Sequence, residues 1–136
     1  MAPRFNFIGI VVADMADSLS FYRRLGLDMP AEADQEPHVE VALPGGVRLG
    51  FDTEDVIRSI DPTWTRPSGG HQIALAFACD DSAEVDSTYA ALVAAGARGH
   101  TEPWDAFWGQ RYSVLLDPDG NHVELYAALE GDGTET

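Results

Sequence analysis

The chain has little cysteine and little positive charge. Its 136 residues include one cysteine, Cys79, so neither an internal disulfide nor a cysteine-rich zinc site can stabilise the fold. The 8 Lys+Arg residues stand against 23 Asp+Glu, which gives a formal net charge of −15 at pH 7. Such a field repels nucleic-acid phosphates and argues against binding of DNA or RNA. Solubility is one reading of this charge, and attraction of a cationic ligand is the other.

Long apolar runs are also missing. No stretch approaches the roughly 20 apolar residues that a bilayer span requires, and the first residues lack the apolar core of a signal peptide. The sequence therefore predicts no membrane association and a cytoplasmic location. Hydrophobic residues make up 45% and charged residues 23% of the chain, which is typical of a globular protein. We expect one structural domain with one sizeable core.

The chain contains a loose internal repeat with an offset of 67 residues. Residues 7–27 resemble residues 74–96, and the offset places Asp14 on Asp81. Each Asp follows a short apolar run typical of a strand, and after each Asp the spacing of apolar residues changes to that of a helix. Gly26 and Gly96 are in the position of glycines that end helices.

Hairpins are predicted after each helix. Residues 38–43 and 47–51 flank a Pro-Gly-Gly turn, and residues 112–116 and 122–126 flank an Asp-Pro-Asp-Gly turn. The expected fold class is α+β, with two βαβββ modules whose curved mixed sheets form a cup. The expected divisions are a first module at 1–56, a linker or flap at 57–70, a second module at 71–129 and a disordered tail at 130–136.

This pattern resembles the vicinal-oxygen-chelate superfamily, which includes glyoxalases, extradiol dioxygenases and bleomycin-resistance proteins. The resemblance spans residues 5–129 and is most specific in VVADMADSLSFYRRLGL and DPDGNHVELY. Within the superfamily, the segments PAEAD, GGVRLGFDT, GGH and PWDAFWGQRY are most similar to mitomycin-resistance-type drug-binding proteins. The resemblance implies a homodimer in which the first half of one chain completes a cup with the second half of the other.

Metal-using members of the superfamily hold a divalent ion with one side chain from each of four strands. The resemblance places these positions at Phe7, Ala74, Glu124 and, depending on the register, Arg48 or Leu49. Only Glu124 can ligate a metal, so we expect no metal and no cofactor. Arg48 is the candidate partner of the Glu124 carboxylate.

No other chemical motif predicts catalysis. The four histidines, at 38, 71, 100 and 122, lack metal-binding spacing, and His71 and His100 lie in loop-like segments. Serine and histidine occur without a nucleophile elbow, and Cys79 is a strand residue of the kind that is usually buried and inert. We therefore predict no catalytic residue.

Aromatic residues gather before the last hairpin. Trp104, Phe107, Trp108 and Tyr112 fall within nine residues, in the segment that leads into the last hairpin, where we expect the tryptophans to lie in a loop. An indole buries a large area of a flat ligand with little loss of rotamer freedom. The resemblance implies that His38 forms a second wall opposite Trp108. Further candidates for lining the site are Phe7, Phe51, Trp64, Arg48, Glu124 and Tyr126.

These observations predict a protein that sequesters a planar aromatic or quinone-like DNA-damaging antibiotic of the mitomycin or bleomycin type without changing it. Two alternatives remain. One is a divergent glyoxalase- or dioxygenase-like enzyme that uses Glu124 as general base, with His38 or a metal assisting. The other is a chaperone that binds a natural product during antibiotic biosynthesis.

Overall fold

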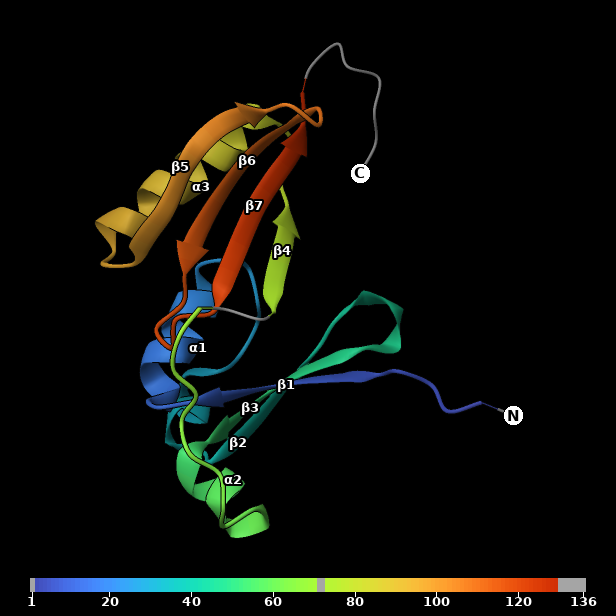
Figure 1. Ribbon diagram of the computed structural model, residues 1–136, viewed down its shortest axis with the longest axis vertical. Helices are drawn as coiled ribbons and strands as arrows, with labels where there is room; N and C mark the ends of the chain where they lie inside the picture. Colours follow the sequence, from blue (N-terminus) through green and yellow to red (C-terminus); the bar gives the residue numbers. More distant parts are fainter. Residues whose placement is uncertain (1, 71–72, 130–136) are drawn as a thin grey trace. The chain divides into compact units, whose positions relative to one another are not determined.

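The computed structural model describes residues 2–70 and 73–129, and the chain forms two compact units, Met1–Ser68 (unit 1) and Gly69–Thr136 (unit 2) (Figure 1). Each unit contains its own sheet. The expected disordered tail at 130–136 and His71 lie outside the described residues.

Unit 1 is a three-stranded sheet with helices. Strand β1 (Phe7–Val12) runs parallel to β3 (Arg48–Thr53), and β2 (His38–Ala42) pairs antiparallel with β3, which gives the order β1-β3-β2. The helices are α1 (Met15–Arg23) and α2 (Glu54–Ile60), with short 3-10 turns at Ala31–Gln35 and Pro44–Gly46.

Helix α1 begins and ends as its sequence predicts. The Asp14 side chain accepts a hydrogen bond from the Asp17 amide at 3.0 Å, which caps the first turn. Beyond the last turn, Leu27 N–H donates to Tyr22 C=O and Gly26 adopts φ 95°, a Schellman ending that favours glycine. The Tyr22 ring packs against the fully buried ring of Phe51, so α1 covers one face of the sheet.

Unit 1 differs from the expected βαβββ module. Its described residues form three strands, and the next element is α2, which crosses the expected boundary at residue 56. The Asp- and Pro-rich composition of residues 53–70 suggested a linker. However, Thr53 caps α2 by accepting from the Val56 amide at 3.4 Å, and Glu54 and Asp55 favour its first turn.

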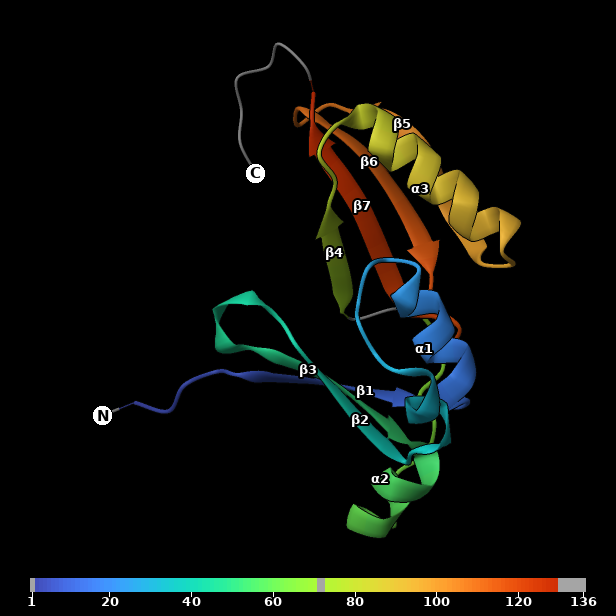
Figure 2. The same ribbon diagram turned by 180° about the vertical axis from the view of Figure 1, so that it is seen from behind.

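Unit 2 has the expected βαβββ order. Strand β4 (Ala74–Ala78) is followed by α3 (Ser82–Ala94), β5 (Arg98–Ala106), β6 (Gln110–Leu116) and β7 (His122–Ala128). The sheet order is β4-β7-β6-β5, with β4 parallel to β7. Helix α3 lies along one face of this sheet (Figure 2), and its Val85 and Leu92 are buried.

The internal repeat is confirmed by the caps of α3. Asp81 accepts from the Glu84 amide at 2.8 Å, as Asp14 does in α1, and Ala97 N–H donates to Leu92 C=O past Gly96. The expected loop at Trp104, however, is wrong, because residues 98–106 form β5. Register shifts on either side of Thr101 interrupt its pairing with β6, which explains why its sequence lacks clear alternation.

Candidate functional site

The aromatic residues predicted in the sequence meet at one hairpin. Trp104 of β5 lies opposite Tyr112 of β6, and the turn between the strands carries Phe107 and Trp108. The Trp108 ring is central: its centroid lies 5.7 Å from that of Trp104, 5.0 Å from Phe107 and 5.0 Å from Tyr112. All three neighbouring rings are close to perpendicular to it. We name these four residues the aromatic cluster.

Much of the aromatic cluster faces solvent. Trp104 is 40% exposed, Trp108 42% and Phe107 90%. The Trp108 indole N–H donates to Gln110 Oε1 at 2.7 Å, so the polar edge of the indole is satisfied within the hairpin. The exposed part of these side chains is aromatic ring surface, on which a flat ligand can stack.

Glu124 lies on the same side of the sheet as the aromatic cluster. On β7, Val123 and Leu125 are buried, and the alternation places Glu124 on the opposite face, which we call the helix-free face of unit 2. Its carboxylate accepts a hydrogen bond from the Tyr112 hydroxyl. Burial, the charge of Glu124 and this hydrogen bond together raise the pKa of Tyr112. Within unit 2, Tyr112 is thus a partner of Glu124, and the pairing of Glu124 with Arg48 of unit 1 stays a prediction.

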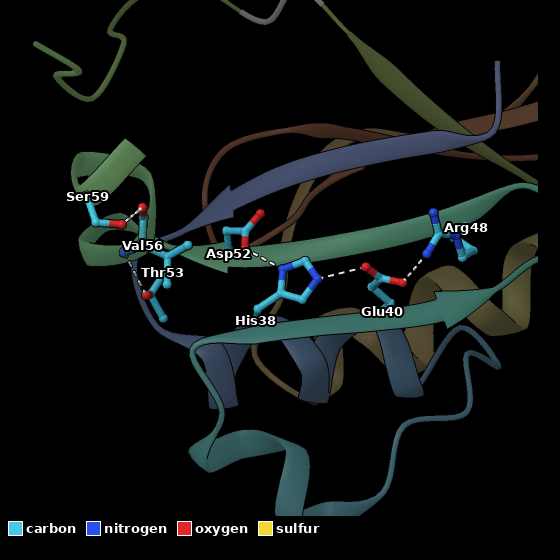
Figure 3. A network of polar contacts seen from close by, with 7 residues as sticks. All are labelled: His38, Glu40, Arg48, Asp52, Thr53, Val56 and Ser59. Atoms are coloured by element: carbon cyan, nitrogen blue, oxygen red, sulfur yellow. Dashed lines mark hydrogen bonds and ion pairs between the residues drawn. The ribbon is translucent and has the colours of Figure 1, made fainter. Parts of the chain in front are cut away.

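A row of alternating charges crosses the corresponding helix-free face of unit 1 (Figure 3). His38 Nδ1 lies 2.5 Å from Asp52 Oδ1, and His38 Nε2 lies 2.8 Å from Glu40 Oε2. Arg48 donates to Glu40 Oε1 at 2.6 Å. Since both partners of the imidazole are carboxylates, both ring nitrogens donate, and the hydrogen bonds to Glu40 and Asp52 raise the pKa of His38.

His38 therefore belongs to a polar network that the sequence analysis did not identify. Strand alternation places Glu40 on the same face as His38, and this part could have been predicted. The contact with Asp52 depends on the pairing of β2 with β3, where His38 lies opposite Asp52. That register was not available from the residues alone.

Phe7 and Arg48 form the other end of this face. The Arg48 guanidinium lies over the Phe7 ring, 5.3 Å from its centroid. The same ring covers Gly50: a Cβ at position 50 would come within 2.8 Å of Phe7 Cε1 and closer still to Cζ. Glycine is required here because the ring approaches the backbone closely.

The strand register also corrects one predicted metal position. In unit 2, Glu124 lies opposite Ala76 of β4. The internal repeat, with its offset of 67 residues, pairs Ala76 with Gly9 of β1, and Gly9 lies opposite Gly50 of β3. The counterpart of Glu124 in unit 1 is therefore Gly50, not Arg48 or Leu49. The chain between β1 and β3 differs in length from the chain between β4 and β7, so the offset of the repeat does not extend to these later strands and did not give the register of β3.

The residues at the four positions where the superfamily resemblance implies metal ligands, with Gly50 taken as the counterpart of Glu124, do not fit a metal. Phe7, Gly50 and Ala74 offer no side-chain donor atom, and Glu124 bonds Tyr112. Across residues 2–70 and 73–129, no three His, Cys, Asp or Glu side chains are arranged to hold an ion. The structure does bring the rings of His100 and His122 to 4.7 Å, a contact that their sequence spacing did not suggest.

The remaining candidates lie in different surroundings. Phe51 is part of the core beneath α1. The guanidinium groups of Arg58 and Arg66 lie 5.1 Å and 6.0 Å from the centroid of the Trp64 ring. Tyr126 is on β7 and lies opposite Tyr112 of β6. Burial raises the pKa of the Cys79 thiol to about 11, with the charge of Glu84 adding to this, which disfavours a reactive thiolate.

A shallow depression of about 780 Å³ lies elsewhere in unit 1, near the first turns of α1 and α2. It contains none of the predicted site residues. Its charged lining residues are Asp14, Asp34, Glu36, Glu54, Asp55 and Arg58.

Within the described part of the chain, no helix is long and apolar enough to cross a bilayer.

Comparison with known proteins agrees with this architecture. The structure is similar to a glyoxalase/bleomycin resistance protein/dioxygenase family enzyme from Burkholderia phytofirmans PsJN, with 21% identity, TM-score 0.78, and coverage of 91% of this chain and 98% of that chain. It is also similar to a glyoxalase/bleomycin resistance protein/dioxygenase from Nocardioides, with 25% identity, TM-score 0.72, and coverage of 100% and 91%. A glyoxalase-related enzyme from Fulvimarina pelagi gives 20% identity, TM-score 0.75, and coverage of 99% and 98%. No curated protein matches the chain.

Sequence comparison with protein families gives the same answer. The family model described as Glyoxalase/Bleomycin resistance protein/Dioxygenase superfamily matches residues 4–125, which include both sheets up to the middle of β7. The chain therefore belongs to the glyoxalase/bleomycin resistance/dioxygenase superfamily, that of the vicinal-oxygen-chelate proteins.

Proposed function

We propose that this protein binds a planar aromatic or quinone-like DNA-damaging antibiotic and sequesters it without chemical change. The observation that carries the proposal is the solvent-exposed aromatic cluster on the β5–β6 hairpin. The likeness of PWDAFWGQRY to mitomycin-resistance-type proteins supports the choice of ligand class. Lowering the concentration of free drug is sufficient for resistance, so no turnover is required.

The side chains at the family's metal positions support binding over chemistry. Phe7 and Ala74 cannot ligate an ion, and the Phe7 ring occupies the space beside Gly50. Ring faces and apolar surface have replaced chelating atoms at these positions. A surface of this kind favours flat ligands through stacking.

The energies required are compatible with this cluster. Sequestration at cellular concentrations needs a Kd in the micromolar range or below, about 8 kcal/mol of binding free energy. Each aromatic contact adds about 0.5–1.5 kcal/mol beyond the burial of area. Stacking on Trp108, contact with Trp104 and burial of the ligand's apolar surface together can reach this value.

Tryptophan fluorescence titrated with planar antibiotics tests the proposal. We expect Trp108→Ala to weaken binding at least about tenfold, because it removes the central ring of the cluster. Trp64→Phe serves as the comparison: Arg58 and Arg66 already lie against the Trp64 ring, so we expect affinity to stay the same. Unchanged affinity in Trp108→Ala would remove the aromatic cluster from the binding site.

An enzymatic role is the second candidate, because His38 lies between Asp52 and Glu40 at hydrogen-bonding distance. An imidazole held in this way can donate and accept protons, and related proteins from Burkholderia phytofirmans and Fulvimarina pelagi are described as enzymes. Metal analysis of the purified protein and turnover assays with and without EDTA distinguish the two roles. Stoichiometric metal with EDTA-sensitive turnover would favour the enzyme.

A further inference from the structure

The Glu124 carboxylate and the aromatic cluster belong to one polar and aromatic surface. Tyr112 connects them: its ring is 5.0 Å from Trp108, and its hydroxyl bonds Glu124. We propose that the aromatic cluster and Glu124 together bind ligands that carry an organic cation on or beside the flat ring. This inference rests on the proposed function and adds the charge of the ligand to it.

The arrangement of the rings supports a cationic ligand. Trp104 and Trp108 meet at 88°, Phe107 and Trp108 at 87°, and Trp108 and Tyr112 at 76°. Perpendicular packing leaves ring faces pointing in different directions, and the face of an aromatic ring carries negative charge density that attracts cations, most strongly for tryptophan. The indole N–H of Trp108 already donates a hydrogen bond to Gln110, so Trp108 offers the ligand its ring and not a hydrogen-bond donor.

The charges around the cluster favour the same ligand. The partner of Glu124 is the neutral phenol of Tyr112, which leaves the negative charge of the carboxylate uncompensated by that contact. Arg111 lies next to Tyr112 in the sequence but on the α3 side of the sheet, where it pairs with Asp86 at 2.9 Å and Asp105 at 3.0 Å. The register places Arg98 at the opposite end of the β5–β6 pair from Trp104. With a net charge of −15, the protein also attracts cations over a longer range.

Calorimetric titration with two probes of the same shape tests this inference. N-methylquinolinium is a permanent cation, and quinoline is its uncharged counterpart near neutral pH. We expect the cation to bind about tenfold more tightly, and this preference to shrink to about threefold or less in Glu124→Gln. Added salt should weaken binding of the cation more than binding of quinoline.

Glu102→Gln provides the matched control. It removes the same charge from the same unit, but the charge of Glu102 acts on Tyr89 of α3, where it raises the pKa of that phenol. We expect the preference for the cation to survive in this variant. Survival of the preference in Glu124→Gln would overturn the role of Glu124.

The outcomes separate this inference from the proposed function. Equal affinity for the two probes, with both weakened by Trp108→Ala, would overturn the preference for cations and leave planar binding intact. Absence of binding by both probes and by planar antibiotics would overturn the inference and the proposed function together.

Discussion

His38 is held by charge on both sides. The hydrogen bonds to Glu40 and Asp52 raise its pKa above the ordinary value of 6.5, so the folded state binds this proton more tightly than the unfolded state. The network's contribution to the free energy of unfolding is fully present below the unfolded pKa and is lost as the pH rises through the folded pKa. We therefore expect His38→Gln to destabilise the protein more at about pH 6 than at about pH 9.

Urea unfolding of the wild type and the variant at the two pH values measures this difference. An NMR titration of the His38 ring should give a pKa above 6.5 in the wild type, and Glu40→Gln should lower it, because the largest stabilising contact is removed. A pH-independent effect of His38→Gln, together with an ordinary pKa, would contradict the network.

Gly50 and Phe7 are coupled by close contact. We expect Gly50→Ala to destabilise the protein by about 1–2 kcal/mol, because the added Cβ would displace the Phe7 ring and with it the Arg48 stack. In a Phe7→Ala background the collision is absent, and alanine restricts the unfolded chain more than glycine does. The same substitution should then be neutral or stabilising. Thermal or urea unfolding of the wild type, the two single variants and the double variant gives the coupling free energy between the two positions. Additive changes in the free energy of unfolding would contradict the contact.

At the scale of elements, the helix caps should behave as independent units. We expect Asp81→Ala to cost about 1 kcal/mol of unfolding free energy, because the Glu84 amide loses its acceptor at the start of α3. Asp81→Asn should retain most of the stability, since asparagine is an equally good cap. Urea unfolding compares the two variants, and equal losses in both would indicate that charge, not capping, matters at this position.

The helices and strands also show which parts of the fold could be predicted from the sequence. Both main helices, their starts after an Asp and their glycine endings were predicted, because these stops and the periodicity are local signals. Helix α2 was missed, because it lies in Asp- and Pro-rich sequence. The strand β5 was implied by the βαβββ order but its residues were not located, because register shifts interrupt it. The aromatic cluster was predicted as a group of neighbours in sequence. The contacts of Glu124 with Tyr112 and of Phe7 with Gly50 depend on pairing between strands, which the residues alone did not determine.

For the whole molecule, the superfamily resemblance leads us to propose a homodimer in which His38 and Trp108 of one binding site come from different subunits. Light scattering coupled to size exclusion should then give twice the chain mass of 14.7 kDa, and calorimetry should give two ligands per dimer. A protein that binds ligand fully at a mass of 14.7 kDa would contradict the shared site.

We propose that flat ligands bind to the ring faces of the aromatic cluster. The three indole N–H signals, from Trp64, Trp104 and Trp108, are the most direct probes, and substitution of each tryptophan assigns them. In an NMR titration with a planar antibiotic, we expect large ring-current shifts of the Trp108 and Trp104 signals and a smaller change for Trp64. Saturable binding that leaves the Trp104 and Trp108 signals in place would contradict it.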